Sequence, residues 1–586
     1  MLLKSIGSFV VALSLLLQGY GLVEKPINEA GIQSSLTSLM RQAGVPGMAI
    51  VVFKHGEATS KMNLGVRNAN TQEPVLDETV FEAGSLSKPV FAYLMFRLID
   101  KGQYDLDKPL VEYMPIDLIE KNVLHHPINE KGFDSEGFSQ ITARMILSHS
   151  SGLPTVSFDR LLYRPGFKFS YSPGGYVYLQ HVLEYLTKKS LTELAEELVF
   201  KPLEMKRSSF IWKKDFESSV AVGHNILGKT TGKMRKRYLP VSASSLYTTA
   251  GDYAIFIRAV LNGTGMKKET LTLMLSKQID VDDNLGYGNG FGIEFHDSNR
   301  FIWQWGDFGI YKNFVIINPV TGSGILFLSN SENGMSFAQQ LLERTLDFGQ
   351  CWSITWLGYD RFDSPRNQYI KIIREDGHKE ALRLLPEFRL KYPEVFDEKG
   401  IEQLAYALLY ADDPDAAIEF FNVNTQVGKP TSQAFKILAD AYFYANNDFL
   451  ARQNYQKALA IDGNDRLASN ALFHIDLIEK FKDKSTDELK STLTKLRSDH
   501  PQAFEKEVFV KLGMTLIESG RMKDALQIFR LGDFLYPNSS IILYGIAHAS
   551  MELGEFNQAL EFSKRALALD GGNMSALWIK SQVENR

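Results

Sequence analysis

The sequence predicts an α+β domain, in which helices flank an antiparallel sheet, followed by an all-α domain of helical repeats. Strand-like apolar runs stand near both ends of the first 350 residues, and helical patterns lie between them. After about residue 360 these runs stop, and small residues recur at a fixed spacing. At 586 residues the chain exceeds what one hydrophobic core usually supports, so at least two domains are expected.

The runs that we expect to form the sheet come from two distant parts of the chain. The first covers residues 48–53 and is followed by a turn at Gly56. The others are separated by Gly, Asn and Pro and cover residues 300–305, 313–317 and 324–328. Between them, residues 90–101 and 176–187 have the spacing of amphipathic helices. One sheet is therefore predicted to combine N-terminal and C-terminal pieces.

The N-terminus has the features of a secretory signal peptide over residues 1–22. Lys4 precedes an apolar run at residues 6–17, which ends at small and polar residues. The run is shorter than the roughly 20 apolar residues of a membrane-spanning helix. We therefore expect a secreted or periplasmic protein, or one anchored in the membrane if the segment is not cleaved.

Composition narrows the classes of function. The chain is 44% hydrophobic and 23% charged, which is typical of a folded protein, and its net charge of -5 gives no general reason to bind nucleic acid. A single cysteine, Cys351, excludes a disulfide within the chain and a metal site built from cysteines. We expect no metal and no cofactor.

The second half carries a repeat marked by small residues. Ala417 and Ala451 are 34 residues apart, and so are Ala525 and Ala559. Three of these alanines have an aromatic residue four positions further along the chain, namely Phe421, Tyr455 and Phe529. We expect a further helix pair between the two pairs, over residues 466–500. The pattern resembles tetratricopeptide repeats over residues 365–586, which implies a helical solenoid offering a surface to a protein partner.

The segment Ser85-Leu86-Ser87-Lys88 is the candidate for chemistry in the first half. It has the pattern Ser-x-x-Lys, which places the serine and the lysine three residues apart. Residues three apart share a face of a helix. The Lys88 side chain can then approach the Ser85 hydroxyl, which is a weak nucleophile until a neighbour accepts its proton. Alone, such a serine can merely cap a helix.

The surrounding residues strengthen the case. Residues 81–89 and 141–154 together resemble the penicillin-recognising serine hydrolases, which include class C β-lactamases and penicillin-binding proteins. The resemblance covers residues 25–350. It implies that Ser85 is a nucleophile that forms an acyl-enzyme, while His149 is interpreted as a hydrogen-bonded structural residue.

The same resemblance assigns Tyr171, within residues 165–173, as the tyrosine beside the nucleophile. A phenol titrates near pH 10, so it acts as a base only if a nearby cation, such as Lys88, lowers its pKa. Where the family has an asparagine, this chain has Pro173, so one substrate contact is lost.

The third family motif, Lys-x-Gly or His-x-Gly, maps to Gln304-Trp305-Gly306. The backbone N–H of Asp307 would join that of Ser85 in an oxyanion hole. Gln304 replaces the cation that helps to hold a substrate carboxylate in β-lactamases. This replacement argues against efficient β-lactam turnover and favours esters, amides or peptides of D-amino acids.

Two functions follow. The first is a serine hydrolase in which Ser85, Lys88 and Tyr171 are catalytic, with residues 304–307 at the substrate. The alternative is a binding or scaffold protein that uses the first domain as a receptor and the repeats for protein interaction. An intact Ser85, Lys88 and Tyr171 favours the enzyme.

Overall fold

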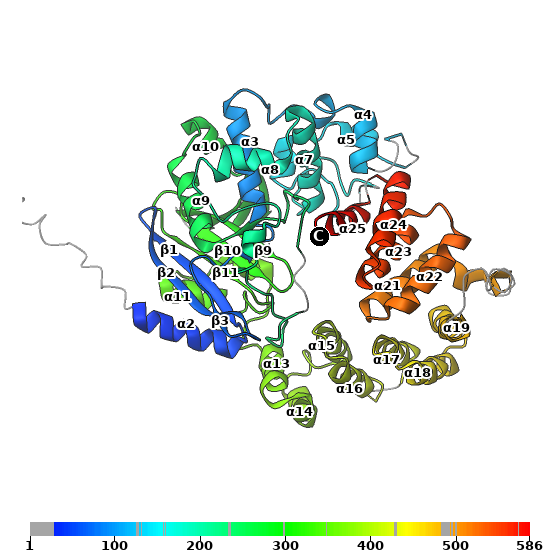
Figure 1. Cartoon of the computed structure of the whole chain (residues 1–586). Coiled ribbons are helices and arrows are strands. Elements are labelled where there is room, and N and C mark those ends of the chain that lie inside the picture. The colour runs from blue at the N-terminus through cyan, green and yellow to red at the C-terminus, as the bar shows by residue number, and fades with distance from the viewer. Residues whose placement is uncertain are drawn as a thin grey trace, which may run out of the picture.

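A sheet domain and a repeat domain make up the structure (Figure 1). The computed structural model describes residues 29–586 except 125–127, 130–131, 156–157, 159, 232–235, 297–298, 347, 427–429, 482–492, 494–495, 499–500 and 572. The predicted signal peptide therefore lies outside the described residues. Within them, no helix is both long and apolar enough to cross a bilayer.

The sheet domain is built on nine strands that pair antiparallel, with the two ends of the domain meeting in the middle of the sheet. Strand β1 pairs with β2 on one side and with β11 on the other. In spatial order the strands are β3 (Glu73–Pro74), β2 (Glu57–Asn68), β1 (Gly47–Lys54), β11 (Gly324–Ser329), β10 (Lys312–Ile317), β9 (Asn299–Asp307), β8 (Gly292–His296), β7 (Leu285–Tyr287) and β6 (Ile279–Asp282). A separate pair joins β4 (Phe81–Glu82) to β5 (Tyr247–Thr248).

Both faces of the sheet are covered, which explains why β1 is apolar along its whole length. Met48, Ile50 and Val52 pack toward α2 (Glu29–Ala43) and α11 (Ala338–Leu346). Ala49, Val51 and Phe53 pack into the larger core on the opposite face. That core also contains the buried sides of α3 (Ser87–Asp100), α7 (Pro173–Thr187) and α9 (Ala250–Asn262). The remaining helices of this domain are α4 (Ile116–Ile119), α5 (Ser135–Ser139), α6 (Ala143–Leu147), α8 (Leu191–Ala195) and α10 (Lys268–Met274).

The predicted fold class is confirmed. The four predicted strand-like runs correspond to β1, β9, β10 and β11, and the two helical patterns correspond to α3 and α7. Both helices begin three residues before the predicted start, because a proline occupies the first turn of each, where a missing N–H costs nothing. In α7 the side chain of Ser172 also caps the helix by accepting from the Gly175 N–H.

The repeat domain is entirely helical in its described part. Its marker alanines, Ala417, Ala451, Ala525 and Ala559, are all fully buried between helices. The helices are α13 (Pro365–Asp376), α14 (His378–Lys391), α15 (Glu398–Tyr410), α16 (Pro414–Asn424), α17 (Ser432–Tyr444), α18 (Asp448–Ile461), α19 (Arg466–Phe481), α21 (Lys506–Glu518), α22 (Met522–Leu535), α23 (Ser540–Glu552), α24 (Phe556–Leu569) and α25 (Met574–Glu584). Of the helix pair predicted over residues 466–500, α19 is described, whereas most of the second half lies outside the described residues.

One repeat shows why small residues are required. A Cβ atom on Gly513 or on Gly545 would lie 2.4 Å from the ring of Phe529. The ring thus fills the space between two neighbouring helices, α21 and α23, which approach closely because neither carries a side chain there.

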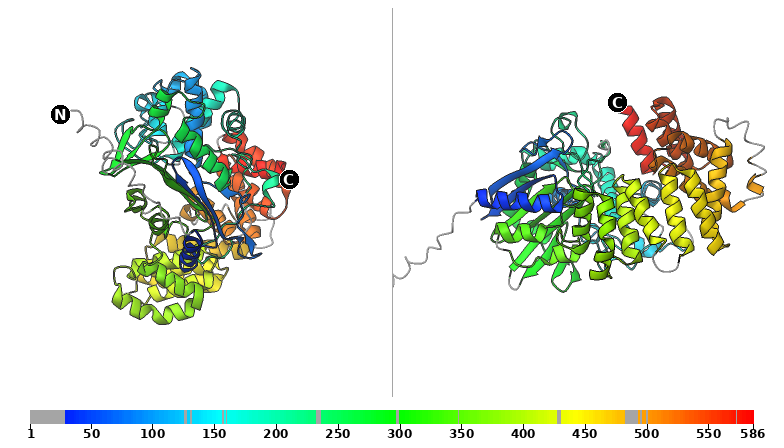
Figure 2. Two further views of the ribbon diagram at one scale, coloured as in Figure 1. Left: turned by 90° about the vertical axis from the view of Figure 1, so that its left-hand side faces the viewer. Right: turned by 90° about the horizontal axis from the view of Figure 1, so that it is seen from below.

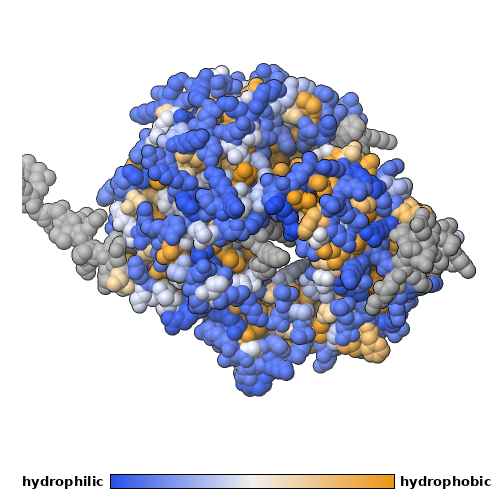
Figure 3. Space-filling model, in the orientation of Figure 1, coloured by the Kyte–Doolittle hydropathy of each residue, from blue (hydrophilic) through white to orange (hydrophobic). Residues whose placement is uncertain are grey.

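The repeats form an arc whose two ends both contact the sheet domain (Figures 1 and 2). Near its start, Asn225 donates to the carbonyl of Ala411 at 2.8 Å, and Arg374 donates to the carbonyl of Gln42 at 2.9 Å. At its end, the Gln582 side chain on α25 donates to the carbonyl of Lys236. Between these contacts the molecular surface is hollowed (Figure 3).

Candidate active site

Ser85 lies immediately before α3, on a segment held between β5 and the end of β9. Gly84 has a φ of 57°, a left-handed conformation that favours glycine, and it turns the chain from β4 into the helix. The Ser87 hydroxyl fixes this turn by donating to the Gly84 carbonyl at 2.7 Å and accepting from the Leu246 N–H at 3.0 Å. Ser85 itself stays partly exposed, as a nucleophile must.

Lys88 is fully buried beneath Ser85. Its Nζ lies 2.9 Å from Ser85 Oγ and donates to the carbonyl of Ala243, also at 2.9 Å. Burial lowers the pKa of Lys88 well below its ordinary value because the interior disfavours the ammonium form. A neutral amine at this distance can accept the proton of the Ser85 hydroxyl.

Tyr171 stands on the other side of Ser85. Lys88 Nζ lies 4.7 Å from the centre of its ring, over the face rather than beside the hydroxyl. Burial raises the pKa of Tyr171, and its hydrogen bonds with Ser85 and Gln304 oppose that shift without reversing it. The raised pKa of Tyr171 and the lowered pKa of Lys88 favour Lys88 rather than Tyr171 as the acceptor of the Ser85 proton.

Gln304 is buried, and its amide is used by the protein. The nitrogen lies 3.3 Å from the Ser85 carbonyl oxygen and 3.3 Å from the Tyr171 hydroxyl, and it donates to the Trp305 carbonyl at 3.2 Å. Its oxygen accepts from the Tyr287 hydroxyl at 2.6 Å. Gln304 thus holds the Ser85 backbone and the Tyr171 phenol, and its contact with substrate stays a prediction.

Gly306 and Asp307 bring the edge of β9 against the Ser85 segment. A Cβ on Gly306 would lie 2.1 Å from the carbonyl oxygen of Ala83, so no larger residue fits. The N–H of Phe308 donates to the carbonyl of Tyr311, so these two residues form a hydrogen-bonded pair. Hydrogen-bonded and non-hydrogen-bonded pairs alternate along an antiparallel ladder, so the next pair, Asp307 with Lys312, is not hydrogen-bonded. The Asp307 N–H therefore faces away from β10. The Asp307 nitrogen lies 3.3 Å from the position of a Cβ on Gly84. The N–H groups of Ser85 and Asp307 thus border the same space.

The Asp307 carboxylate is already engaged. It pairs with Lys312 Nζ at 2.6 Å and accepts from the Tyr359 hydroxyl at 2.6 Å and from the Gly309 N–H at 2.9 Å. These three contacts fix the end of β9. The Asp307 carboxylate is therefore paired within the protein, and the role of its backbone N–H in an oxyanion hole stays a prediction.

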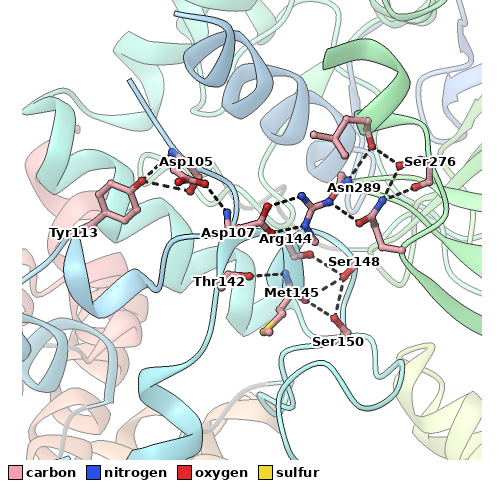
Figure 4. A network of polar contacts seen from close by, with 12 residues as sticks. Asp105, Asp107, Tyr113, Thr142, Arg144, Met145, Ser148, Ser150, Ser276 and Asn289 are labelled. Carbon is pink, nitrogen blue, oxygen red and sulfur yellow. Dashed lines mark hydrogen bonds and ion pairs between the residues drawn. The ribbon is translucent and has the colours of Figure 1, made fainter. Parts of the chain in front are cut away.

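A polar network behind the site fixes the segment that carries His149 (Figure 4). Arg144 on α6 binds both oxygens of Asp107, at 2.5 and 2.7 Å, and also reaches Gln278 at 2.7 Å. His149 follows one turn later; its Nδ1 accepts from the Ser172 N–H at 3.0 Å, and its ring lies 4.2 Å from that of Tyr171. A buried histidine in this position supports the Tyr171 ring.

Comparison with known proteins decides the family. Residues 32–350, more than half of the chain, match the family model described as Beta-lactamase. The chain belongs to the Beta-lactamase family. A second model, the tetratricopeptide repeat, matches residues 541–573, which cover α24 and all but the first residue of α23.

The relatives of this Beta-lactamase family member are distant. It is 22% identical to "Protein flp" of Staphylococcus aureus (strain MW2) over 50% of this chain and 61% of that protein, and so spans less than two thirds of that relative's length. It is 25% identical to "Penicillin-binding protein 4" of Amycolatopsis lactamdurans over 55% of this chain and 90% of that protein. Among solved structures, D-alanine carboxypeptidase AmpC from Burkholderia cenocepacia matches with a TM-score of 0.46 and 20% identity, covering 54% of this chain and 98% of that one.

Sequence reasoning missed the residues that reach the site from the connector between the domains. Tyr359 bonds to Asp307, and Trp356, on α12 (Trp352–Leu357), contacts the rings of Phe169 and Trp305. The available signal was the pair of tryptophans four residues apart, Trp352 and Trp356, which share one face of a helix.

Proposed function

We propose that the sheet domain is a serine hydrolase that cleaves an ester, amide or peptide through an acyl-enzyme on Ser85. The observation that carries the proposal is the buried Lys88 amine, 2.9 Å from Ser85 Oγ with a lowered pKa. A merely structural lysine would be expected to keep its charge in water or in an ion pair.

The proposed reaction uses the groups around Ser85 as follows. Ser85 Oγ attacks the substrate carbonyl carbon while its proton passes to Lys88 Nζ, and the N–H groups of Ser85 and Asp307 stabilise the oxyanion. When the intermediate collapses, the protonated Lys88 returns the proton to the leaving group, with the Tyr171 hydroxyl alongside to relay it. Water then attacks the acyl-enzyme by the same route, releasing the acid and freeing Ser85.

Covalent labelling tests this function. We expect a fluorophosphonate to add one adduct to the wild-type protein and none to Ser85→Ala, measured by intact mass. Ser170→Ala is the matched control, because Ser170 is a partly exposed serine beside Tyr171, and it should label like the wild type. An unlabelled wild-type protein would contradict the hydrolase and favour the receptor or scaffold.

The pH dependence distinguishes the two candidate bases. The base must be unprotonated, so kcat/KM for an activated ester should fall as the pH drops through the pKa of Lys88. Burial places the pKa of Lys88 well below 10.5 and raises that of Tyr171 above 10.0. The plot of kcat/KM against pH should therefore have one acid limb, set by Lys88, and should be level from there to about pH 10. Tyr171→Phe should lower the rate but keep the limb in place. A limb that disappears in Tyr171→Phe would make the phenol the base.

We further propose that the repeats bind a protein partner and that the protein acts outside the cytoplasm. Exposed aromatic side chains on two repeat helices support the first point, namely Tyr410 on α15, at 81% exposure, and Phe449 on α18, at 68%. A peptide library selected on the full chain, with Tyr410→Ala/Phe449→Ala as the counter-selection, tests it. N-terminal sequencing of protein exported by its host tests the predicted signal peptide.

A further inference from the structure

Four partly exposed aromatic side chains form a continuous wall beside Ser85. Tyr171 lies 4.5 Å from Trp305 between ring centres, Trp305 lies 6.0 Å from Trp356, and Trp356 lies 6.0 Å from Phe169. The wall starts at Tyr171, a hydrogen-bond partner of Ser85. Aromatic rings in contact with one another and still partly open to solvent provide a surface that favours flat apolar groups.

The structure holds Trp356 in the wall through a buried carboxylate. Glu294 on β8 is fully buried and accepts from the N–H groups of Trp352, at 2.7 Å, and Ser353, at 3.0 Å, which open α12. His296 bonds to the same carboxylate at 2.6 Å. These two hydrogen bonds satisfy free N–H groups at the start of α12 and fix the direction of the helix, so Trp356 faces β9.

The charges around the wall do not favour an anionic substrate. Lys88 is fully buried, and Lys312 is 7% exposed and paired with Asp307. The Lys168 ammonium lies 5.1 Å from the ring of Tyr163. Gln304 stands where a family cation would be, and its amide is satisfied within the protein. Among the lysines just named, none is free to pair with a carboxylate on the acyl group, which would lose its water here without compensation.

We infer that the site takes substrates whose acyl group is neutral and aromatic and lies against Trp305 and Trp356. The inference rests on the proposed hydrolase and specifies its substrate class. It also assigns a specificity residue to the connector: Trp356 comes from outside the predicted sheet domain, and it touches the acyl group rather than the reacting atoms.

Three 4-nitrophenyl esters test this inference on the full chain, because they share one leaving group and differ in the acyl part. We expect kcat/KM for the phenylacetyl ester to exceed that for the acetyl ester and for the anionic hemisuccinyl ester by about tenfold or more. In Trp356→Ala the ratio of the phenylacetyl value to the acetyl value should fall to about one, because the side chain that favours the aromatic acyl group is gone. Trp352→Ala, which removes a tryptophan from the same helix but outside the wall, is the control and should keep the preference.

The outcomes separate the two claims. Equal values for the phenylacetyl and acetyl esters in the wild type, a preference for the hemisuccinyl ester, or an unchanged preference in Trp356→Ala would each overturn the substrate class. Fluorophosphonate labelling of Ser85 in the same preparation shows whether the hydrolase itself stands. If Trp352→Ala loses the preference together with Trp356→Ala, Trp356→Phe decides: an aromatic contact predicts that it retains most of the preference, and loss there overturns the assignment.

Discussion

Lys88→Met is expected to lower kcat/KM by about 10³-fold or more, because it removes the base for both acylation and deacylation. Methionine has a similar length and suits a buried site, so the fold should survive. The measurement is hydrolysis of an activated ester, together with the rate of fluorophosphonate labelling. Lys168→Met, an exposed lysine on the segment that leads to Tyr171, is the control and should stay within about twofold of the wild type.

The same substitution has an expected effect on stability with a definite pH dependence. In the wild type the pKa of Lys88 is lower in the folded protein than in the unfolded chain. At a pH between these two values, Lys88 is protonated in the unfolded chain and neutral in the folded protein. Folding then releases a proton, so the folded state becomes more stable as the pH rises. Methionine has no such dependence. The free energy of unfolding of Lys88→Met relative to the wild type should therefore be most favourable below the folded pKa of Lys88 and decrease as the pH rises toward 10.5. A difference that does not vary with pH would contradict the lowered pKa.

Gly306→Ala is expected to abolish activity and to cost about 1–3 kcal/mol of stability, the usual range for overpacking. The added methyl group would lie 2.1 Å from the Ala83 carbonyl oxygen, so β9 and the Ser85 segment must move apart. That movement separates the N–H groups of Ser85 and Asp307. Urea unfolding and ester hydrolysis, measured on the same preparation, give the two effects.

The control for this substitution is Gly309→Ala, in the turn between β9 and β10. A Cβ on Gly309 would meet no atom within 4 Å. Its φ of 66° makes alanine moderately strained, but the two N–H groups keep their places. Activity should then remain. If Gly306→Ala retained wild-type activity, the pairing of these N–H groups as an oxyanion hole would be wrong.

The features that depend on short stretches of sequence could be predicted. Ser85 and Lys88 are three residues apart at the start of a helix, so helical geometry alone brings them together. The hairpin of β10 and β11 follows from apolar runs on either side of a turn at Asn318. The 34-residue spacing of the marker alanines predicted helix packing, and their burial agrees with it.

The features that depend on tertiary contacts could not be predicted. The hydrogen bond between Tyr287, on β7, and the Gln304 side chain is one such contact, because nothing in the sequence brings these two residues together. The raised pKa of Tyr171 depends on how completely neighbouring segments enclose its hydroxyl. The role of Trp356 requires Glu294, 62 positions earlier in the chain, to hold α12 against β9.

The repeat arc is joined to the sheet domain by the chain itself at its start and by the contact of α25 with Lys236 at its end, so the molecule is a ring that noncovalent contacts close. In an open solenoid each repeat contacts only its neighbours, so the last repeat is stabilised from one side only and the curvature can vary. Here α25 is tied at Lys236 and α15 ends against Asn225, so neither end is free. If the contact at one end of the arc opens, the contact at the other end still holds the two domains together. The separated groups then stay at a high effective concentration, and the open contact re-forms readily. Tension applied along the repeats is therefore transmitted at two separate points to the domain that carries Ser85.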